Sequence, residues 1–113
     1  MDHQPPPRRP AIRSVSFEDV GEALKRLVPI ALPATRAAET GASSKVADFL
    51  LAWWNGDDTG HFPILHLCNL DEPIAEDMLI IMAYLAANST VYADQWGYRD
   101  SMDELWQRYR AID

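Results

Sequence analysis

Apolar residues recur at three- and four-residue steps in four separate segments, and this spacing constrains the fold of the chain more than any other feature. Such spacing places apolar side chains on one face of an α-helix. Stretches that contain proline or glycine separate the segments, as is typical of turns and helix ends. The chain has 113 residues, of which 48% are hydrophobic, enough to build one core. The sequence therefore predicts a single compact all-α domain of four main helices, with about four to five helices in total.

Residues 1–15 differ in composition from the rest of the chain. They contain four of the eight prolines, and three arginines against one acid. Proline has no amide donor and favours polyproline II. We therefore expect residues 1–15 to be a disordered Pro/Arg-rich tail and residues 16–113 to form the folded domain. An alternative is that the tail is a ligand for an aromatic groove or an electrostatic tether.

The expected bounds of the first helical region follow from a capping residue and two prolines. Ser16 is a suitable N-cap, and two acids follow it in the first turn. Pro29 and Pro33 interrupt the apolar pattern, which predicts a kink or two successive helical pieces. We expect the region to end at Thr40-Gly41, because glycine accepts the left-handed conformation that ends many helices.

The second helix is expected at residues 45 to about 55, with Ser43 or Ser44 as its cap. Residues 56–63 have the composition of a turn. Residues 64–70 are short and mixed in character, so the sequence leaves open whether they form a helical turn or an extended piece.

A third helix is expected after Asp71, an acidic cap, with Pro73 in its first turn. Apolar side chains cover most of its circumference, which predicts a central helix buried on most sides and ending near residues 88–89. The spacing of Ser101 and Glu104 is that of a capping box and predicts the start of the last helix.

The net charge of −7 is unevenly distributed along the chain. The tail is +2 and the remainder is −9, which argues against direct binding to a nucleic-acid backbone. No lysine or arginine lies in the 53 residues between Lys45 and Arg99. Eight acids lie there: Asp48, Asp57, Asp58, Asp71, Glu72, Glu76, Asp77 and Asp94. This stretch predicts an acidic surface for a partner protein with a basic surface, although caps, turns and solvated positions would also account for these acids.

Aromatic residues are numerous, and two of the four tryptophans, Trp53 and Trp54, are neighbours. We expect one of them to pack under the acidic loop while the other contacts residues 91–98. An exposed tryptophan beside acids would instead be an anchor for a partner. The candidate partner-binding residues are therefore Trp54, Asp57, Asp58, His61, Glu76, Asp77 and Trp96.

The chemistry of a metal or catalytic site has weaker support in the sequence. The segment 57–71 offers possible ligands in His61, His66, Cys68 and the acids Asp57, Asp58 and Asp71, but their spacing matches no known ligand pattern. Cys68 lies within an apolar run, where we expect a buried and unreactive thiol. We expect no catalytic residue, metal or cofactor, and keep a metal-dependent enzyme using residues 57–71 as an alternative.

Localisation and covalent structure are also constrained by the sequence. The single cysteine cannot form an internal disulfide. The longest apolar run, residues 78–87, is ten residues long, and a membrane-spanning helix needs about 20. No secretory signal is evident, so we expect a cytoplasmic protein without a membrane contact.

Several stretches of the sequence resemble a known group of proteins. They are the string from Val46 to Asn55, the turn with Asp57, Asp58, Gly60 and Phe62, residues 67–71, residues 74–78, and Gly97-Tyr98. Over about residues 22–110 the chain resembles small uncharacterised proteins of proteobacterial integrative conjugative elements, plasmids and prophages, classed as a domain of unknown function. The resemblance carries no catalytic residue.

The resemblance implies a non-enzymatic accessory protein of a mobile genetic element, and the charge pattern predicts that it binds another protein through an acidic and aromatic surface. One alternative is an acidic, nucleic-acid-mimicking inhibitor of a host defence or DNA-handling enzyme. The chain could be a monomer, or a homodimer formed through an apolar face of residues 74–88.

Overall fold

Four α-helices and three short 3-10 helices make up the described part of the chain, residues 14–88 and 91–111, in a computed structural model. The α-helices are α1 (Phe17–Ala31), α2 (Gly41–Thr59), α3 (Glu72–Ala87) and α4 (Arg99–Tyr109). The 3-10 helices are η1 (Arg36–Ala38), η2 (Ile64–Asn69) and η3 (Ala93–Trp96). No strand occurs in these two ranges, so the prediction of an all-α fold with four main helices is confirmed. The predicted disorder of the tail concerns residues 1–13, which lie outside the described residues.

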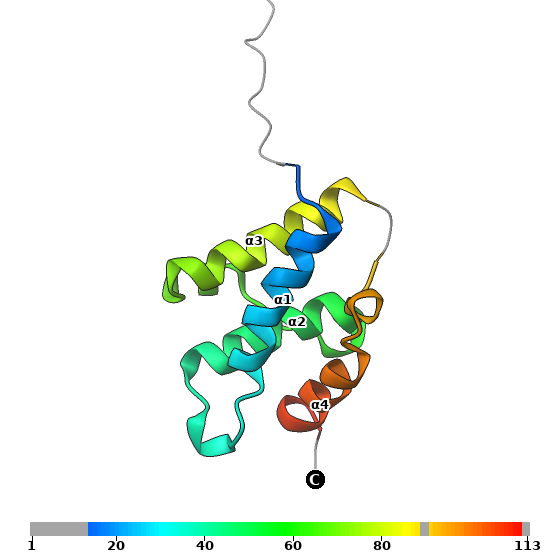
Figure 1. The fold of residues 1–113 in the computed structure, drawn as a ribbon. Coiled ribbons are helices and arrows are strands. Elements are labelled where there is room, and N and C mark those ends of the chain that lie inside the picture. The colour runs from blue at the N-terminus through cyan, green and yellow to red at the C-terminus, as the bar shows by residue number, and fades with distance from the viewer. Residues whose placement is uncertain (1–13, 89–90, 112–113) are drawn as a thin grey trace, which may run out of the picture.

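Helix α1 occupies the centre of the fold. It packs against α3 and against α2, and α4 packs against α2, as Figure 1 shows. The predicted cap is confirmed: the Ser16 hydroxyl accepts the Asp19 amide, and the Asp19 carboxylate accepts the Ser16 amide. The buried side chains of α1 are Val20, Ala23, Leu24, Leu27, Val28 and Ala31. Their three- and four-residue spacing gives α1 one broad apolar face that contacts two helices.

Helix α3 does not have the central position that its apolar sequence predicts. Only Asp77, Met78 and Ile81 are buried, and Leu79 is 52% exposed. Among the described residues, α1 is the helix that packs extensively on α3, which leaves much of the rest of the circumference of α3 open. The helix therefore presents two large apolar side chains, Leu79 and Met82, to solvent.

The boundary between the first two helices was predicted wrongly. Thr40-Gly41 does not end a helix, and it begins α2 instead: the Thr40 hydroxyl accepts the Ser43 amide while the Ser43 hydroxyl accepts the Thr40 amide. The φ angle of Gly41 is not positive, so Gly41 does not adopt the left-handed conformation that glycine permits. The helix before it ends at Ala31, two residues ahead of Pro33.

Helix α2 is longer than expected and bends near its end. Asn55 has non-helical angles (φ −151°, ψ 70°), so the predicted end near residue 55 marks a kink, and one further turn follows. The Thr59 hydroxyl lies 2.8 Å from the carbonyl oxygen of Asn55 and 3.2 Å from that of Leu51. The Thr59 hydroxyl thus reaches back from the last turn to carbonyl groups before and at the kink, which holds this turn against the helix.

Three further predictions concern residues 64–69 and the starts of α3 and α4. Residues 64–69 form helical turns rather than an extended piece. Pro73 lies in the first turn of α3 as predicted, but the Asp71 side chain makes no capping hydrogen bond. Helix α4 starts at Arg99 with Tyr98 as the N-cap, so Ser101 lies inside the helix and does not cap it.

The end of α4 is fixed to the connection between α1 and α2. The Tyr109 hydroxyl donates to the Ala31 carbonyl oxygen at 2.7 Å, and Arg108 donates to the Pro33 carbonyl oxygen at 3.1 Å. Arg110 pairs with Asp48 of α2 at 2.6 Å. The bonds from Tyr109 and Arg108 satisfy carbonyl groups at and just after the end of α1.

Among the described residues, none of the helices is sufficiently long and apolar to traverse a bilayer.

The Tyr109 contact predicts how stability depends on alkaline pH. Burial raises the pKa of Tyr109 above its ordinary value of 10.0. A pKa that is higher in the folded state contributes stability below the unfolded pKa, and this contribution is lost as pH rises through the folded pKa. Tyr109→Phe should cost about 0.5–1.5 kcal/mol at neutral pH, because it removes the hydrogen bond to Ala31.

The measurement is urea unfolding of both proteins at neutral pH and at a series of pH values rising from 10.0. The free energy of unfolding should fall more for the native chain than for Tyr109→Phe, and the difference between them should shrink. Parallel losses in the two proteins would contradict the prediction.

Candidate functional site

A pocket of about 390 Å³ lies between α2 and α3. This volume is within the range of about 300–1,000 Å³ that is typical of ligand sites. Helix α2 and the segment after it provide Phe49, Ala52, Trp53, Gly56, Gly60, His61 and Phe62, and α3 provides Met82 and Leu85. Most of this lining is apolar or aromatic, so the pocket suits an apolar group of a ligand. We call it the α2/α3 pocket.

The aromatic rings of the α2/α3 pocket hold one another in place. Phe62 meets Phe49 edge-on at 5.5 Å between ring centroids, and His66 meets Phe62 edge-on at 5.9 Å. The Trp53 indole donates its Nε1 hydrogen to the Val91 carbonyl oxygen at 2.9 Å. Rings that are fixed before a ligand arrives lose less entropy when it binds.

One wall of the pocket depends on a glycine. The Gly60 amide donates to the Gly56 carbonyl oxygen at 3.1 Å, which closes the last turn of α2. A Cβ atom at Gly60 would lie 2.5 Å from that oxygen and 2.9 Å from the Gly56 Cα atom. Only glycine fits this close approach between backbones. At Gly56, by contrast, a Cβ would meet nothing within 4 Å.

Apolar side chains are exposed on both elements next to the pocket. Met82, which lines it, is 36% exposed, and Leu79 lies one turn earlier on α3. Ile64 and Leu65 of η2 follow the lining residue Phe62 in sequence and are 78% and 76% exposed. Exposed apolar side chains on elements that flank a pocket are candidates for an interaction surface.

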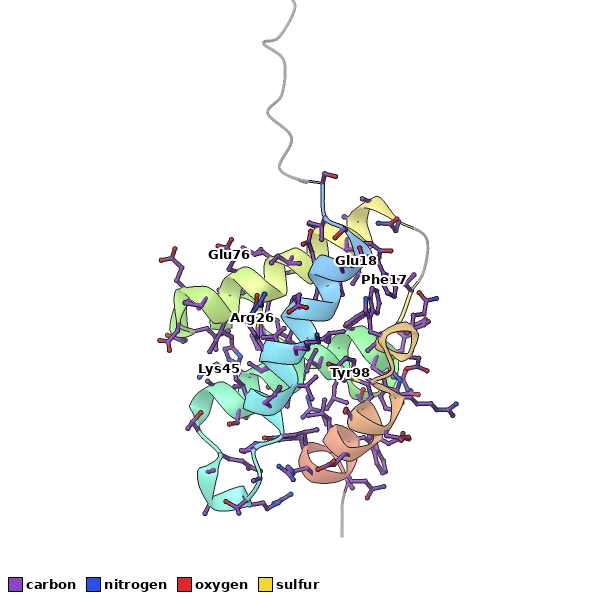
Figure 2. The ribbon with its side chains drawn as sticks, viewed as in Figure 1. Phe17, Glu18, Arg26, Lys45, Glu76 and Tyr98 are labelled. Atoms are coloured by element: carbon purple, nitrogen blue, oxygen red, sulfur yellow. The ribbon has the colours of Figure 1, made fainter. Side chains whose placement is uncertain are left out.

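Two of the eight acids between Lys45 and Arg99 are used inside the fold. Asp77 is 5% exposed and accepts two hydrogen bonds from Arg26, of 2.9 Å and 2.8 Å. This hydrogen bond raises the pKa of the Arg26 guanidinium further above its ordinary value. Figure 2 shows Arg26 on the α1 side of this contact. Asp48 pairs with Arg110. Asp77 therefore takes no part in an exposed acidic surface.

The remaining six acids of this stretch are exposed: Asp57, Asp58, Asp71, Glu72, Glu76 and Asp94. Asp57 and Asp58 lie in the turn between two lining residues, Gly56 and Gly60. Glu76 lies on the outer side of α3 (Figure 2). Of the predicted site residues, His61 lines the pocket, and Asp57 and Asp58 lie between two lining residues in sequence without lining the pocket themselves. Asp77 lies in the contact between α1 and α3.

The tryptophans have mostly internal contacts. Trp96 stacks on Phe17 at 4.4 Å, meets Trp53 edge-on at 5.9 Å, and donates its indole hydrogen to the Phe17 carbonyl oxygen. Tyr84 of α3 contacts the same ring at 5.7 Å. The prediction that one of the paired tryptophans contacts residues 91–98 is confirmed for Trp53. Trp54 is half-buried against the core.

The possible metal ligands of residues 57–71 do not converge. In the described ranges, no group of three or more His, Cys, Asp or Glu side chains could hold a metal ion. His66 packs against Phe62, and the Cys68 thiol donates to the Leu65 carbonyl oxygen within its own helix. The expectation that Cys68 is buried was wrong, because η2 turns this side chain outward.

Apart from His61, the residues that line the pocket were not among the predicted site residues. Phe49 lies in the second expected helix, and Met82 and Leu85 lie in the helix that was expected to be buried on most sides. Their role follows from the separation of α2 and α3, which no local pattern encodes. Only Gly60 and Phe62, within a stretch of turn composition, carried a signal that could have directed attention to this segment.

The two glycines of the pocket predict opposite effects of the same substitution. Gly60→Ala should destabilise the fold by about 1–3 kcal/mol, because its Cβ overlaps the Gly56 backbone. Gly56→Ala should be neutral or stabilise by up to about 1 kcal/mol, because the helical position is open. Urea unfolding of the two variants measures both effects, and equal destabilisation would refute the assignment.

The acids predict a similar contrast. Asp77→Asn should cost about 1–2 kcal/mol, because it weakens a buried, doubly hydrogen-bonded ion pair whose arginine is partly exposed. Asp57→Asn, at an exposed position, should change stability by less than about 0.5 kcal/mol. Thermal unfolding compares the two, and a large loss for Asp57→Asn would show that this acid is structural.

Comparisons with known proteins add one finding. No curated protein and no solved structure matches the chain. The model of one family, described as a family of unknown function (DUF7673), matches residues 21–110, which include all the residues of the α2/α3 pocket. The chain therefore belongs to the DUF7673 family.

Proposed function

We propose that this protein is a non-enzymatic binding module that docks another protein at the α2/α3 pocket. The observation that carries the proposal is an open apolar pocket whose α3 wall exposes Met82. The partner inserts an apolar side chain among the lining rings. Its flanking basic residues face Asp57 and Asp58 in the adjacent turn.

The energetics favour this division between apolar and charged groups. Burial of apolar surface contributes about 25 cal/mol per Å², so an inserted side chain supplies most of the affinity. A few buried aromatic or apolar anchors usually dominate an interface. The exposed acids act at longer range, over a Debye length of about 8 Å at physiological salt, and mainly speed association with a basic surface.

The biological setting is part of the same proposal. The resemblance to proteins of conjugative elements, plasmids and prophages supports an accessory role on a mobile genetic element. The partner in that setting is a protein of the element or of its host.

A second candidate is an acidic mimic of nucleic acid that inhibits a host defence or DNA-handling enzyme. The observation that favours it is the stretch of 53 residues without lysine or arginine, in which six acids are exposed. In a mimic, carboxylates replace phosphates and the apolar pocket is not needed for binding. The two candidates therefore differ in which substitutions abolish the interaction.

Affinity capture from the host, followed by mass spectrometry, tests the proposal with two pairs of variants. Met82→Glu blocks the pocket with a charge, and Gln107→Glu adds the same charge at an exposed position of α4. Asp57→Asn/Asp58→Asn removes two acids near the pocket, and Asp100→Asn/Asp103→Asn removes two exposed acids of α4. Circular dichroism confirms that each variant is folded.

We expect a partner that Met82→Glu loses and Gln107→Glu retains. Its capture should weaken with Asp57→Asn/Asp58→Asn and with added salt, but not with Asp100→Asn/Asp103→Asn. A partner that is still captured with Met82→Glu but is lost with Asp57→Asn/Asp58→Asn would overturn the pocket proposal in favour of the mimic.

A further inference from the structure

We propose that residues 5–10 of this chain, Pro-Pro-Pro-Arg-Arg-Pro, bind the α2/α3 pocket of the same molecule and compete there with an outside partner. The competition rests on the proposed function, whereas the contact between tail and pocket stands on its own. Three observations support this contact.

The first observation is the chemistry of the lining. Proline-rich segments in polyproline II dock into grooves lined by aromatic rings. Phe49, Trp53 and Phe62 contribute such rings, and Met82 and Leu85 supply the facing apolar wall. Trp53 is already fixed by its bond to Val91, so it presents a rigid surface. A polyproline segment is also stiff before it binds, which lowers the entropy cost on both sides.

The second observation is charge complementarity. Arg8 and Arg9 directly follow the first three prolines, and Asp57 and Asp58 directly follow the lining residue Gly56. Both acids are exposed, and none of the residues that line the pocket is a lysine or arginine. Arginine and carboxylate groups form charge-assisted hydrogen bonds, which are shorter and stronger than neutral ones. The arginines of the tail therefore complement the acids that lie between two lining residues of the pocket.

The third observation is where the described chain begins. Phe17, in the first turn of α1, stacks on Trp96 at 4.4 Å between ring centroids, and Trp96 meets Trp53 of the pocket at 5.9 Å. Two ring contacts in series thus connect the start of α1 to the pocket lining. Pro7 lies seven residues before Ser14 and can span about 20 Å in polyproline II. This span is about twice the length of the two ring contacts taken together.

Attachment to the domain also changes the affinity that is needed. A short tether gives an effective concentration in the millimolar range, so even weak docking fills the pocket. An outside partner must then displace the tail. A tail that occupies the pocket in about nine-tenths of the molecules weakens the apparent affinity for a partner about tenfold.

Nuclear magnetic resonance of the full chain tests the contact directly. The native chain is compared with Pro5→Ser/Pro6→Ser/Pro7→Ser, and with a tail control outside the motif, Asp2→Ser/Gln4→Ser. We expect the proline variant alone to shift the Trp53 indole signal and the amide signals of Gly56, Gly60 and His61. Amides of α4, such as that of Gln107, should not move.

Two further arms identify the source of the contact. A peptide of residues 1–13, added to the proline variant, should return the pocket signals toward their native positions in a saturable way. Arg8→Ser/Arg9→Ser should shift the same signals partway, and added salt should move the native spectrum in the same direction. Dilution of the native chain should leave the pocket signals unchanged, because the contact is within one molecule.

The outcomes separate this inference from the proposed function. Identical pocket signals in the native chain and the proline variant would overturn the tail contact, while loss of the partner in Met82→Glu would still support the binding module. Signals that move on dilution would overturn the contact within one molecule and assign the tail to a second copy. A docked tail with no partner captured would leave the contact standing and overturn the binding module.

Discussion

The apolar face of α1 is the constraint on which the rest of the structure depends. Leu24 and Leu27 are fully buried on this face, which packs against both α2 and α3. Helix α3 is held mainly by α1, whereas α2 packs on both α1 and α4, and the α2/α3 pocket lies between α2 and α3. The exposure of Leu79 and Met82 has the same origin, since α1 already occupies the other side of α3.

Ion pairs between residues distant in sequence arrange the charges around this core. Acids in the 53 residues without lysine or arginine form ion pairs with arginines elsewhere in the chain. Arg26 of α1 pairs with Asp77, and Arg110 pairs with Asp48. Acids near the core are thus neutralised by arginines distant in sequence, which avoids the cost of a buried unpaired charge. The acids that no core position requires, such as Asp57 and Asp58, stay in solvent, where they add charge beside an apolar pocket.

Local signals predicted the fold better than the site. Spacing located all four main helices, and Ser16 marked a true cap, because both depend on residues within one or two turns. The starts of two helices were predicted wrongly because more than one nearby residue could serve as the N-cap. Thr40 caps α2 in place of Ser43 or Ser44, and Ser101 lies inside α4. The buried ion pair of Asp77 could not be predicted, since its partner is 51 positions away.

The sequence by itself determined the class of the protein: an acidic all-α domain whose helices follow from apolar spacing, and a Pro/Arg-rich segment ahead of it. The tertiary structure decided which apolar faces are buried and which are left open. A helix such as α3 has the same spacing whether it lies in the centre or at the edge, and only the position of α1 distinguishes the two. The pocket exists because burial is a property of neighbouring helices, and no single helix encodes it.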